Sequence, residues 1–209
     1  MSTIGAVVQL ATGAKAIADG LAGAKQALAG VREGIGSPKA QVHDLGEPIE
    51  LRIEKIKESI EKGKRDPRFR ELAAKIVSRK CGGKWCVAEK DWRREVEAIF
   101  DFVRDNVRYT RDVTGIDTYQ SPQRTLAWGV GDCDCLSILL AGLLQSVGYP
   151  VKLRVIETKG AGTWSHILPL VGLPPTDPKA WLPLDASVNE RAGWYPPASI
   201  IAKTRDFDA

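Results

Sequence analysis

The sequence predicts an α+β protein, because helical patterns fill the earlier part of the chain and strand patterns follow them. Residues 47–65 and 91–108 carry apolar side chains at helical spacing with charged residues between them, which is typical of amphipathic helices. Residues 133–147 have a wider apolar face, which indicates a buried helix. Three strand-like runs come after it. We therefore expect the buried helix to pack on a small antiparallel sheet, with a helical extension at the N-terminal side.

The charged helices have recognisable starts. In residues 47–65, glutamates alternate with lysines and arginines, so this charge run predicts a solvated helix face. Asp66 is the expected N-cap of the next helix, with Pro67 in its first turn. Asp91 is the expected N-cap of the helix at 91–108.

The buried helix begins at a cysteine. Its apolar residues recur with helical spacing, and Gly148 ends the pattern. Cys133 should lie in the first turn, where backbone N–H groups and the positive end of the helix dipole stabilise a thiolate. The apolar positions are Leu136, Leu139, Leu140, Leu143, Leu144 and Val147.

The expected strands are 151–157, 164–171 and 181–185, joined by Gly- and Pro-rich turns. Residues 109–130 have no clear periodicity, so we expect a long loop that forms a substrate-binding wall before Cys133. The residues after Asp185 show no pattern and are expected to form an irregular tail.

Composition bounds the classes of function. The net charge of +4 is spread along the 209 residues, so nucleic acid is not an expected partner. No run of 18 apolar residues occurs, so we expect no membrane span, and the first residues lack the features of a signal peptide. Residues 1–46 are rich in Gly and Ala, and they predict either a mobile arm that orders against a partner or a plain disordered tail.

The chain has four cysteines, Cys81, Cys86, Cys133 and Cys135. Without a signal peptide, the default expectation is a reducing compartment and free or loosely paired thiols. A zinc site built from all four cysteines is an alternative, because four residues separate Cys81 from Cys86 and a closed site needs two more ligands.

Three residues suggest a catalytic site. Cys133 begins a helix, His166 lies on a later predicted strand, and Asp185 ends the next one. Adjacent antiparallel strands would place His166 beside Asp185, and both could face the tip of the helix that carries Cys133. This is the order of a nucleophile, a general base and acid, and a carboxylate that orients the imidazole. A structural histidine on a strand would give the same pattern.

Specific motifs strengthen the catalytic interpretation. The stretch from Gly131-Asp132-Cys133-Asp134 through Gly148-Tyr149-Pro150 resembles the core motif of the transglutaminase-like superfamily. Ser165-His166-Ile167 and the segment 181–186 resemble its histidine and aspartate motifs, and residues 107–126 look like the variant of tailed-phage and prophage proteins. The resemblance covers about residues 91–187. It implies a papain-like α+β transglutaminase core at 91–209, preceded by a helical extension with a cysteine-containing loop at 47–90.

The resemblance also implies roles for residues. It makes Cys133 the nucleophile, His166 the base and Asp185 the orienting residue, with no metal and no cofactor. Cys135 departs from the family pattern, which usually has an acidic residue there. The helix N-terminus and the imidazolium would lower the pKa of Cys133, and the Cys133 main-chain N–H would be the first oxyanion donor. Tyr109 and Trp128 are candidates for the second donor or the substrate wall.

These features predict a cysteine peptidase or amidase, a hydrolase that acts on a protein or peptide substrate. A cross-linking acyl transferase is an alternative. A structural or assembly protein of a virion that retains the fold is another, with residues 1–46 as the segment that binds a phage-assembly partner. The expected location is the cytoplasm of a bacterial host or the virion.

Overall fold

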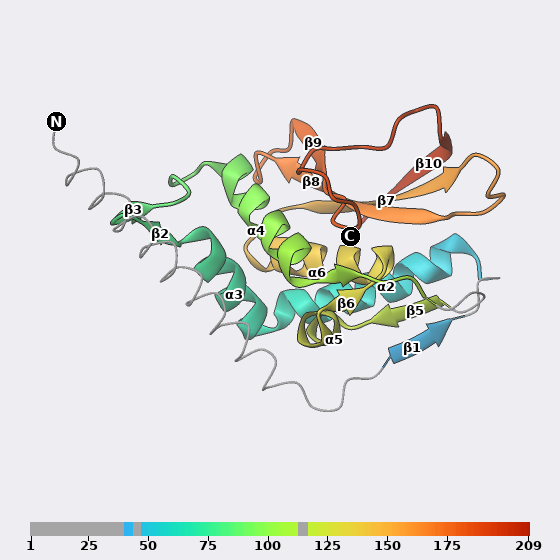
Figure 1. Ribbon diagram of the computed structural model, residues 1–209, viewed down its shortest axis with the longest axis horizontal. Helices are drawn as coiled ribbons and strands as arrows, with labels where there is room; N and C mark the ends of the chain where they lie inside the picture. Colours follow the sequence, from blue (N-terminus) through green and yellow to red (C-terminus); the bar gives the residue numbers. More distant parts are fainter. Residues whose placement is uncertain (1–39, 44–46, 113–116) are drawn as a thin grey trace, which may run out of the picture.

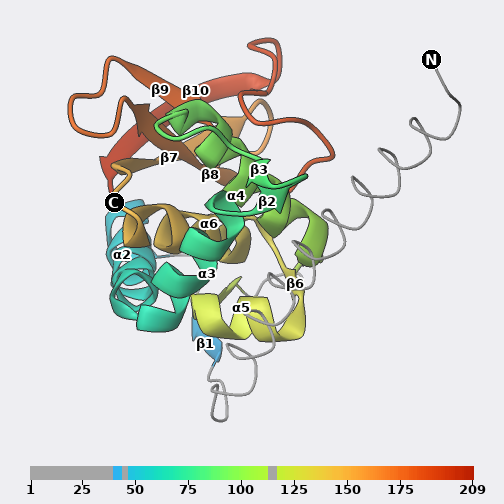
Figure 2. The ribbon, with the colours of Figure 1, turned by 90° about the vertical axis from the view of Figure 1, so that its left-hand side faces the viewer.

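The computed structural model describes residues 40–43, 47–112 and 117–209. A four-stranded antiparallel sheet lies on one side of the long apolar helix α6 (Cys133–Ser146). Helices α2 (Ile49–Arg65) and α5 (Pro122–Trp128) lie on its other side (Figures 1 and 2). The predicted α+β class is confirmed, with α6 at the centre of the fold.

The three charged helices begin close to the predicted positions. Helix α2 buries Ile53, Ile56 and Ile60, and α3 (Pro67–Val77) follows it directly. The Asp66 side chain accepts a hydrogen bond from the Arg68 N–H and thus caps α3 as expected. Helix α4 (Trp92–Asn106) is capped in the same way by Asp91.

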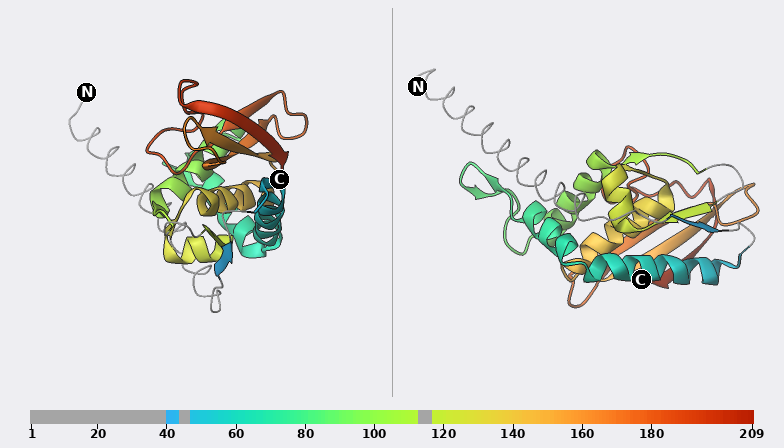
Figure 3. Two further views of the ribbon diagram at one scale, coloured as in Figure 1. Left: turned by 90° about the vertical axis from the view of Figure 1, so that its right-hand side faces the viewer. Right: turned by 90° about the horizontal axis from the view of Figure 1, so that it is seen from below.

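Helix α6 is buried on nearly all sides. Its sequence pattern predicted a wide apolar face, which is less than the burial observed. Two glycines allow α2 to cross it closely. A Cβ atom added at Gly142 would lie 3.6 Å from the Cα of Gly63, so the two backbones are already within contact distance of one added carbon. A Cβ atom added at Gly63 would lie 2.8 Å from the Pro122 Cγ, so this position has no room for one. The view from below shows α2 running along one side of the molecule (Figure 3). The N-terminal helices and the sheet thus share one hydrophobic core with α6.

The sheet has the order β10-β7-β8-β9, with all neighbours antiparallel. Strands β7 (Val151–Thr158), β8 (His166–Leu173) and β9 (Ala180–Pro183) match the three predicted strands. The prediction of an irregular tail was wrong, because β10 (Ile201–Asp208) pairs with β7. Charged residues on this exposed edge strand hid the alternation, and ion pairs such as Arg154–Asp206 join it to β7.

The expected long loop at 109–130 is also partly ordered into regular elements. It contains β5 (Asp117–Gln120) and α5, which begins at an N-cap formed by Ser121. Two short parallel strands, β4 (Arg108–Tyr109) and β6 (Val130–Gly131), bracket the segment. Ser121-Pro122 was a helix-start signal, but the helix is too short to show a periodic pattern.

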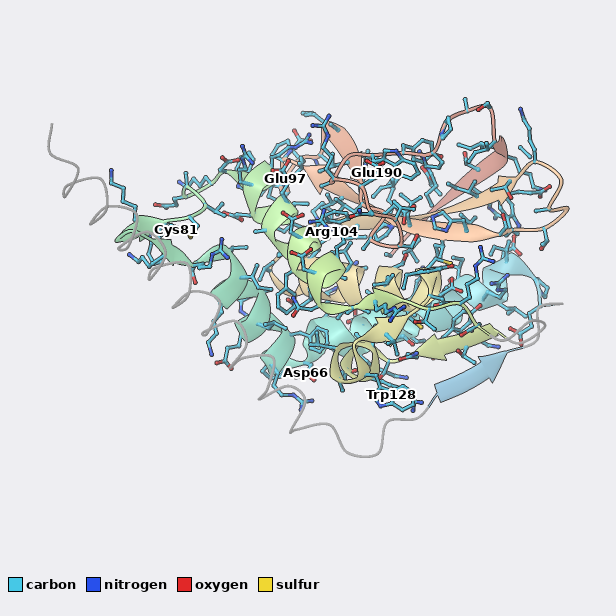
Figure 4. All side chains as sticks on the ribbon, in the orientation of Figure 1. Asp66, Cys81, Glu97, Arg104, Trp128 and Glu190 are labelled. Atoms are coloured by element: carbon cyan, nitrogen blue, oxygen red, sulfur yellow. A yellow bond between two sulfur atoms is a disulfide. The ribbon has the colours of Figure 1, made fainter. Side chains whose placement is uncertain are left out.

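The expectation of free thiols at Cys81 and Cys86 was wrong. These residues form a disulfide that closes the hairpin of β2 (Lys80–Cys81) and β3 (Lys84–Trp85). Figure 4 shows Cys81 at the end of the molecule beyond α3 and α4. The disulfide removes two of the four ligands that the alternative zinc site required, so that interpretation is also wrong.

Most of the expected N-terminal arm, residues 1–39 and 44–46, lies outside the described residues. Residues Ala40–His43 form strand β1, which pairs with β5 in antiparallel register. No helix in the described part of the chain is long and apolar enough to span a membrane.

Candidate active site

Cys133 is the first residue of α6, as the sequence predicted, and its side chain is partly exposed. The turn before it is tightly built. The Asp132 side chain accepts a hydrogen bond of 3.0 Å from the Cys135 N–H and caps the helix. A Cβ atom at Gly131 would lie 2.6 Å from the Cβ of Cys135, so only glycine fits there. The capped turn fixes where the Cys133 thiol lies.

Two carboxylates surround this thiol. One ligand atom from each of Asp132, Cys133 and Asp134 lies within 4.8 Å of the others. Both aspartates are buried, whereas the cysteine is partly exposed. Their negative charges oppose the formation of a thiolate, whereas the helix N-terminus favours it. This is the one group in the described part of the chain whose donor atoms are close enough to hold a metal ion.

His166 and Asp185 are in direct contact. The His166 Nε2 lies 2.7 Å from the Asp185 Oδ2, as expected for residues of adjacent antiparallel strands. Asp185 is buried, whereas the His166 side chain is 21% exposed. Burial alone would raise the pKa of Asp185, but hydrogen bonds from His166 and Ser187 outweigh it, and the net pKa is lowered. Asp185 is therefore held as a carboxylate against the imidazole.

Helix α6 and strand β8 bring Cys133 and His166 to the same end of the core. Near the C-terminal end of α6, the Gln145 amide donates to the Ala209 carbonyl, and the Ala209 N–H donates to Val151 at the start of β7. Strand β7 then runs back along α6, and β8 returns antiparallel to it. Near the other end of the helix, the Ser137 hydroxyl donates to the Ile167 carbonyl at 3.2 Å. Cys133 lies one turn before Ser137, and His166 lies one residue before Ile167.

Alternation along β8 determines which faces its residues occupy. Ile167 and Val171 belong to the main core with α6, whereas Leu168 and Leu170 belong to a second cluster on the opposite face. By this alternation, His166 belongs to the same face as Leu168 and Leu170. It is the first residue of the strand, and its side chain contacts Asp185. The structure therefore joins His166 to Asp185 and brings the start of β8 to the start of α6.

Cys135 is more deeply buried than Cys133. It is fully buried, and its thiol lies 3.5 Å from the Thr118 carbonyl. Burial, together with the charge of Asp132, raises the pKa of the Cys135 thiol far above its usual value. A buried, protonated thiol is a poor nucleophile, so Cys133 is the reactive candidate of the two.

The two aromatic candidates for the wall lie on neighbouring segments, because the Arg108 N–H donates to the Gly129 carbonyl at 2.8 Å. Tyr109 is 41% exposed and pairs with Gly131 across the parallel strands β4 and β6. Partial burial is the largest cause that raises the pKa of Tyr109, and the pairing with Gly131 brings its strand to the turn before Cys133. Trp128 is 54% exposed at the end of α5, where the Arg124 guanidinium stacks 3.5 Å from its ring centre. Figure 4 shows Trp128 on the side of α6 away from the sheet.

Sequence reasoning did not find Ser187, which lies two residues after Asp185. Its hydroxyl donates to the Asp185 Oδ1 at 2.6 Å, and its N–H donates to the same oxygen at 3.1 Å. An aspartate followed by serine two positions later is a common pattern for such local bonds. That signal was present but is too frequent in loops to identify a site by itself.

Comparison with known proteins identifies the family. Residues 83–186 match the model of the transglutaminase-like superfamily. No curated protein matches the chain. Among solved structures, the calcium-bound LapG of Legionella pneumophila is 21% identical with a TM-score of 0.47, and the match covers 75% of this chain and 84% of that one.

Two further structures are similar. A candidate cysteine protease from Cytophaga hutchinsonii is 14% identical with a TM-score of 0.44, over 81% of this chain and 60% of that one. A candidate protease from Parabacteroides distasonis is 11% identical with a TM-score of 0.44, over 56% of this chain and only 23% of that one. The family match includes the start of α6, the start of β8 and Asp185. Residues 83–186 of this chain belong to the transglutaminase-like superfamily.

Proposed function

We propose that this protein is a cysteine-dependent amide-bond hydrolase, with Cys133 as nucleophile, His166 as general base and acid, and Asp185 as the residue that orients the imidazole. The observation that carries the proposal is the 2.7 Å contact between the His166 Nε2 and the Asp185 Oδ2, at the end of the core where α6 begins with a partly exposed cysteine. Membership of the transglutaminase-like superfamily supports it.

The contact supports an assignment of the ring nitrogen that transfers the proton. Because Asp185 holds Nε2, the nitrogen that serves the thiol is Nδ1. Nδ1 takes the proton of the Cys133 thiol, and the thiolate sulfur forms a bond to the carbonyl carbon of the substrate amide. The negative charge that develops on the carbonyl oxygen accepts a hydrogen bond from the Cys133 main-chain N–H.

The imidazolium then returns its proton to the leaving nitrogen, the C–N bond breaks, and a thioester remains on Cys133. In the second half of the reaction, His166 takes a proton from water, and the resulting hydroxide adds to the thioester carbon. The C–S bond breaks, the thiolate recovers the proton from His166, and the product leaves as a carboxylic acid. Water is the only co-reactant, so the proposed reaction is a net hydrolysis.

The test uses a mixture of peptides of defined sequence incubated with the protein in water enriched in oxygen-18. Hydrolysis leaves one oxygen-18 atom in each new C-terminal carboxylate, which mass spectrometry detects. Loss of this label in Cys133→Ala, with label retained in Cys135→Ala, is the expected result. Cross-linked peptides without the label would show acyl transfer instead, and undiminished labelling in Cys133→Ala would contradict the proposal.

A further inference from the structure

The carboxylate of Asp185 accepts hydrogen bonds from different partners at its two oxygens. Oδ2 faces the His166 Nε2 at 2.7 Å. Oδ1 accepts from the Ser187 hydroxyl at 2.6 Å and from the Ser187 N–H at 3.1 Å. Asp185 is only 5% exposed, so water hydrates its charge poorly. The protein donors supply the hydrogen bonds that water would otherwise provide.

The two bonds to Oδ1 restrict rotation of the carboxylate. A carboxyl group held by one oxygen alone can turn about its terminal torsion, which is a broad and soft rotation. Two donors from Ser187, one of them on the backbone of the next turn, fix Oδ1 and thereby direct Oδ2 toward the imidazole. The titratable group that faces this carboxylate is the His166 imidazole, on β8.

We infer that Ser187 is a positioning residue of the active site, which acts through Asp185 to hold the His166 imidazole with Nε2 toward the carboxylate and Nδ1 toward the thiol. This inference rests on the proposed function, since a positioning role has meaning only if His166 serves Cys133. Ser187 itself need not touch the substrate, because its hydroxyl is directed at Asp185. The assignment adds a fourth residue to the three that the motif contains.

Ser187→Ala removes the hydroxyl bond and keeps the N–H bond, and Ser187→Thr keeps both donors. Ser78→Ala is the matched control, because the Ser78 hydroxyl also makes one 2.6 Å bond, to the Ala74 carbonyl at the end of α3, far from Asp185 in sequence. The measurement is the nitrogen-15 spectrum of the imidazoles against pH. The chain has only two histidines, so a His43→Gln background assigns the His166 signals.

The expected result is a shift in the low-pH inflection of the His166 signals, which marks protonation of Asp185. Losing a donor to the charged form raises the pKa of a carboxyl, so the inflection should move upward by about one pH unit in Ser187→Ala. It should stay unchanged in Ser78→Ala and return toward the wild-type position in Ser187→Thr. An unchanged inflection in a folded Ser187→Ala protein would overturn the inference, even if its melting temperature fell.

The alkylation rate of Cys133 separates this inference from the proposed function. If both hold, Ser187→Ala shifts the inflection and slows alkylation of Cys133 by iodoacetamide near neutral pH by about threefold or more. A second outcome is that the inflection shifts in Ser187→Ala, but Cys133 of the wild type is alkylated no faster than Cys133 of a His166→Ala variant. Ser187 then orients the His–Asp pair, and the proposed function fails.

Discussion

The His166 Nε2 and the Asp185 Oδ2 lie 2.7 Å apart although the two residues are 19 positions apart in the sequence. The contact depends on the antiparallel pairing of β8 with β9, which brings the two ends of that segment together. A buried carboxylate whose partner is a partly exposed imidazole is an arrangement that favours proton transfer at the other ring nitrogen.

The two thiols outside the disulfide, Cys133 and Cys135, should react at very different rates. Cys133 is partly exposed, whereas Cys135 is buried with a raised pKa. In the folded protein, we expect iodoacetamide to alkylate Cys135 at least about tenfold more slowly than Cys133. Peptide mass spectrometry of partially alkylated protein measures both rates, and unfolding in urea should equalise them. Faster labelling of Cys135 in the folded state would show that the nucleophile has been misassigned.

Asp132 affects Cys133 in two ways, by capping α6 and by placing a negative charge near the thiol. The substitution Asp132→Asn separates the cap from the charge. Asparagine is as good an N-cap as aspartate, so the free energy of unfolding should change by only a few tenths of a kcal/mol. The substitution removes a negative charge within 4.8 Å of the thiol, so the pH midpoint of Cys133 alkylation should fall by about one unit. Asp66→Asn, at the cap of α3, should leave that midpoint unchanged. A midpoint that stays or rises in Asp132→Asn would contradict this electrostatic effect.

The hairpin disulfide predicts the number of accessible thiols. Unfolded, non-reduced protein should react with two equivalents of a thiol reagent, from Cys133 and Cys135, and four equivalents should react only after reduction. Because the bridge closes a short loop, its loss in Cys81→Ser with Cys86→Ser should cost about 2 kcal/mol of unfolding free energy. Four reactive thiols before reduction, in protein purified without reductant, would contradict the pairing.

Asp66 predicts a pH dependence of stability. Hydrogen bonds from Arg68 outweigh burial and lower the pKa of Asp66 in the folded protein, where the carboxylate also accepts from the Gln123 side chain. Its contribution is therefore present above the unfolded pKa of about 3.9 and is lost as the pH falls through the folded pKa.

We expect Asp66→Asn to lower the free energy of unfolding in urea by about 1 kcal/mol at pH 7, since the Arg68 partner is partly exposed and solvent weakens the ion pair. At the acid end, where wild-type Asp66 is itself protonated, the two proteins should become equally stable. The comparison is made by urea titration at pH 7 and at several pH values below about 3.9, where the difference should shrink as the pH falls. A difference that keeps its full size at the lowest pH at which both proteins fold would mean that Asp66 acts without its charge.

The sequence could predict those elements whose pattern is long and whose caps are local. Asp66 and Asp91 marked two helix starts correctly, and the apolar repeat after Cys133 marked α6. The pairing of His166 with Asp185 followed from two adjacent strands joined by a turn, which is also short-range information.

The sequence could not predict elements that depend on distant partners. Strand β10 is mostly exposed and charged, so it has little apolar alternation, and its pairing with β7 joins residues far apart in the chain. The disulfide was missed because spacing alone does not distinguish a bridged hairpin from free thiols. Ser187 was missed because its importance depends on the burial of Asp185, which only the packed core determines.

The most direct test of the proposed site is the alkylation rate of Cys133 against pH in wild type and in His166→Ala. If the imidazole activates the thiol, wild-type Cys133 should react rapidly near pH 6, and His166→Ala should lose about tenfold or more of that rate while remaining folded. At a pH above the ordinary thiol range, the two proteins should react alike. Equal rates at every pH would show that Cys133 and His166 do not act together, and the proposed hydrolase mechanism would be wrong.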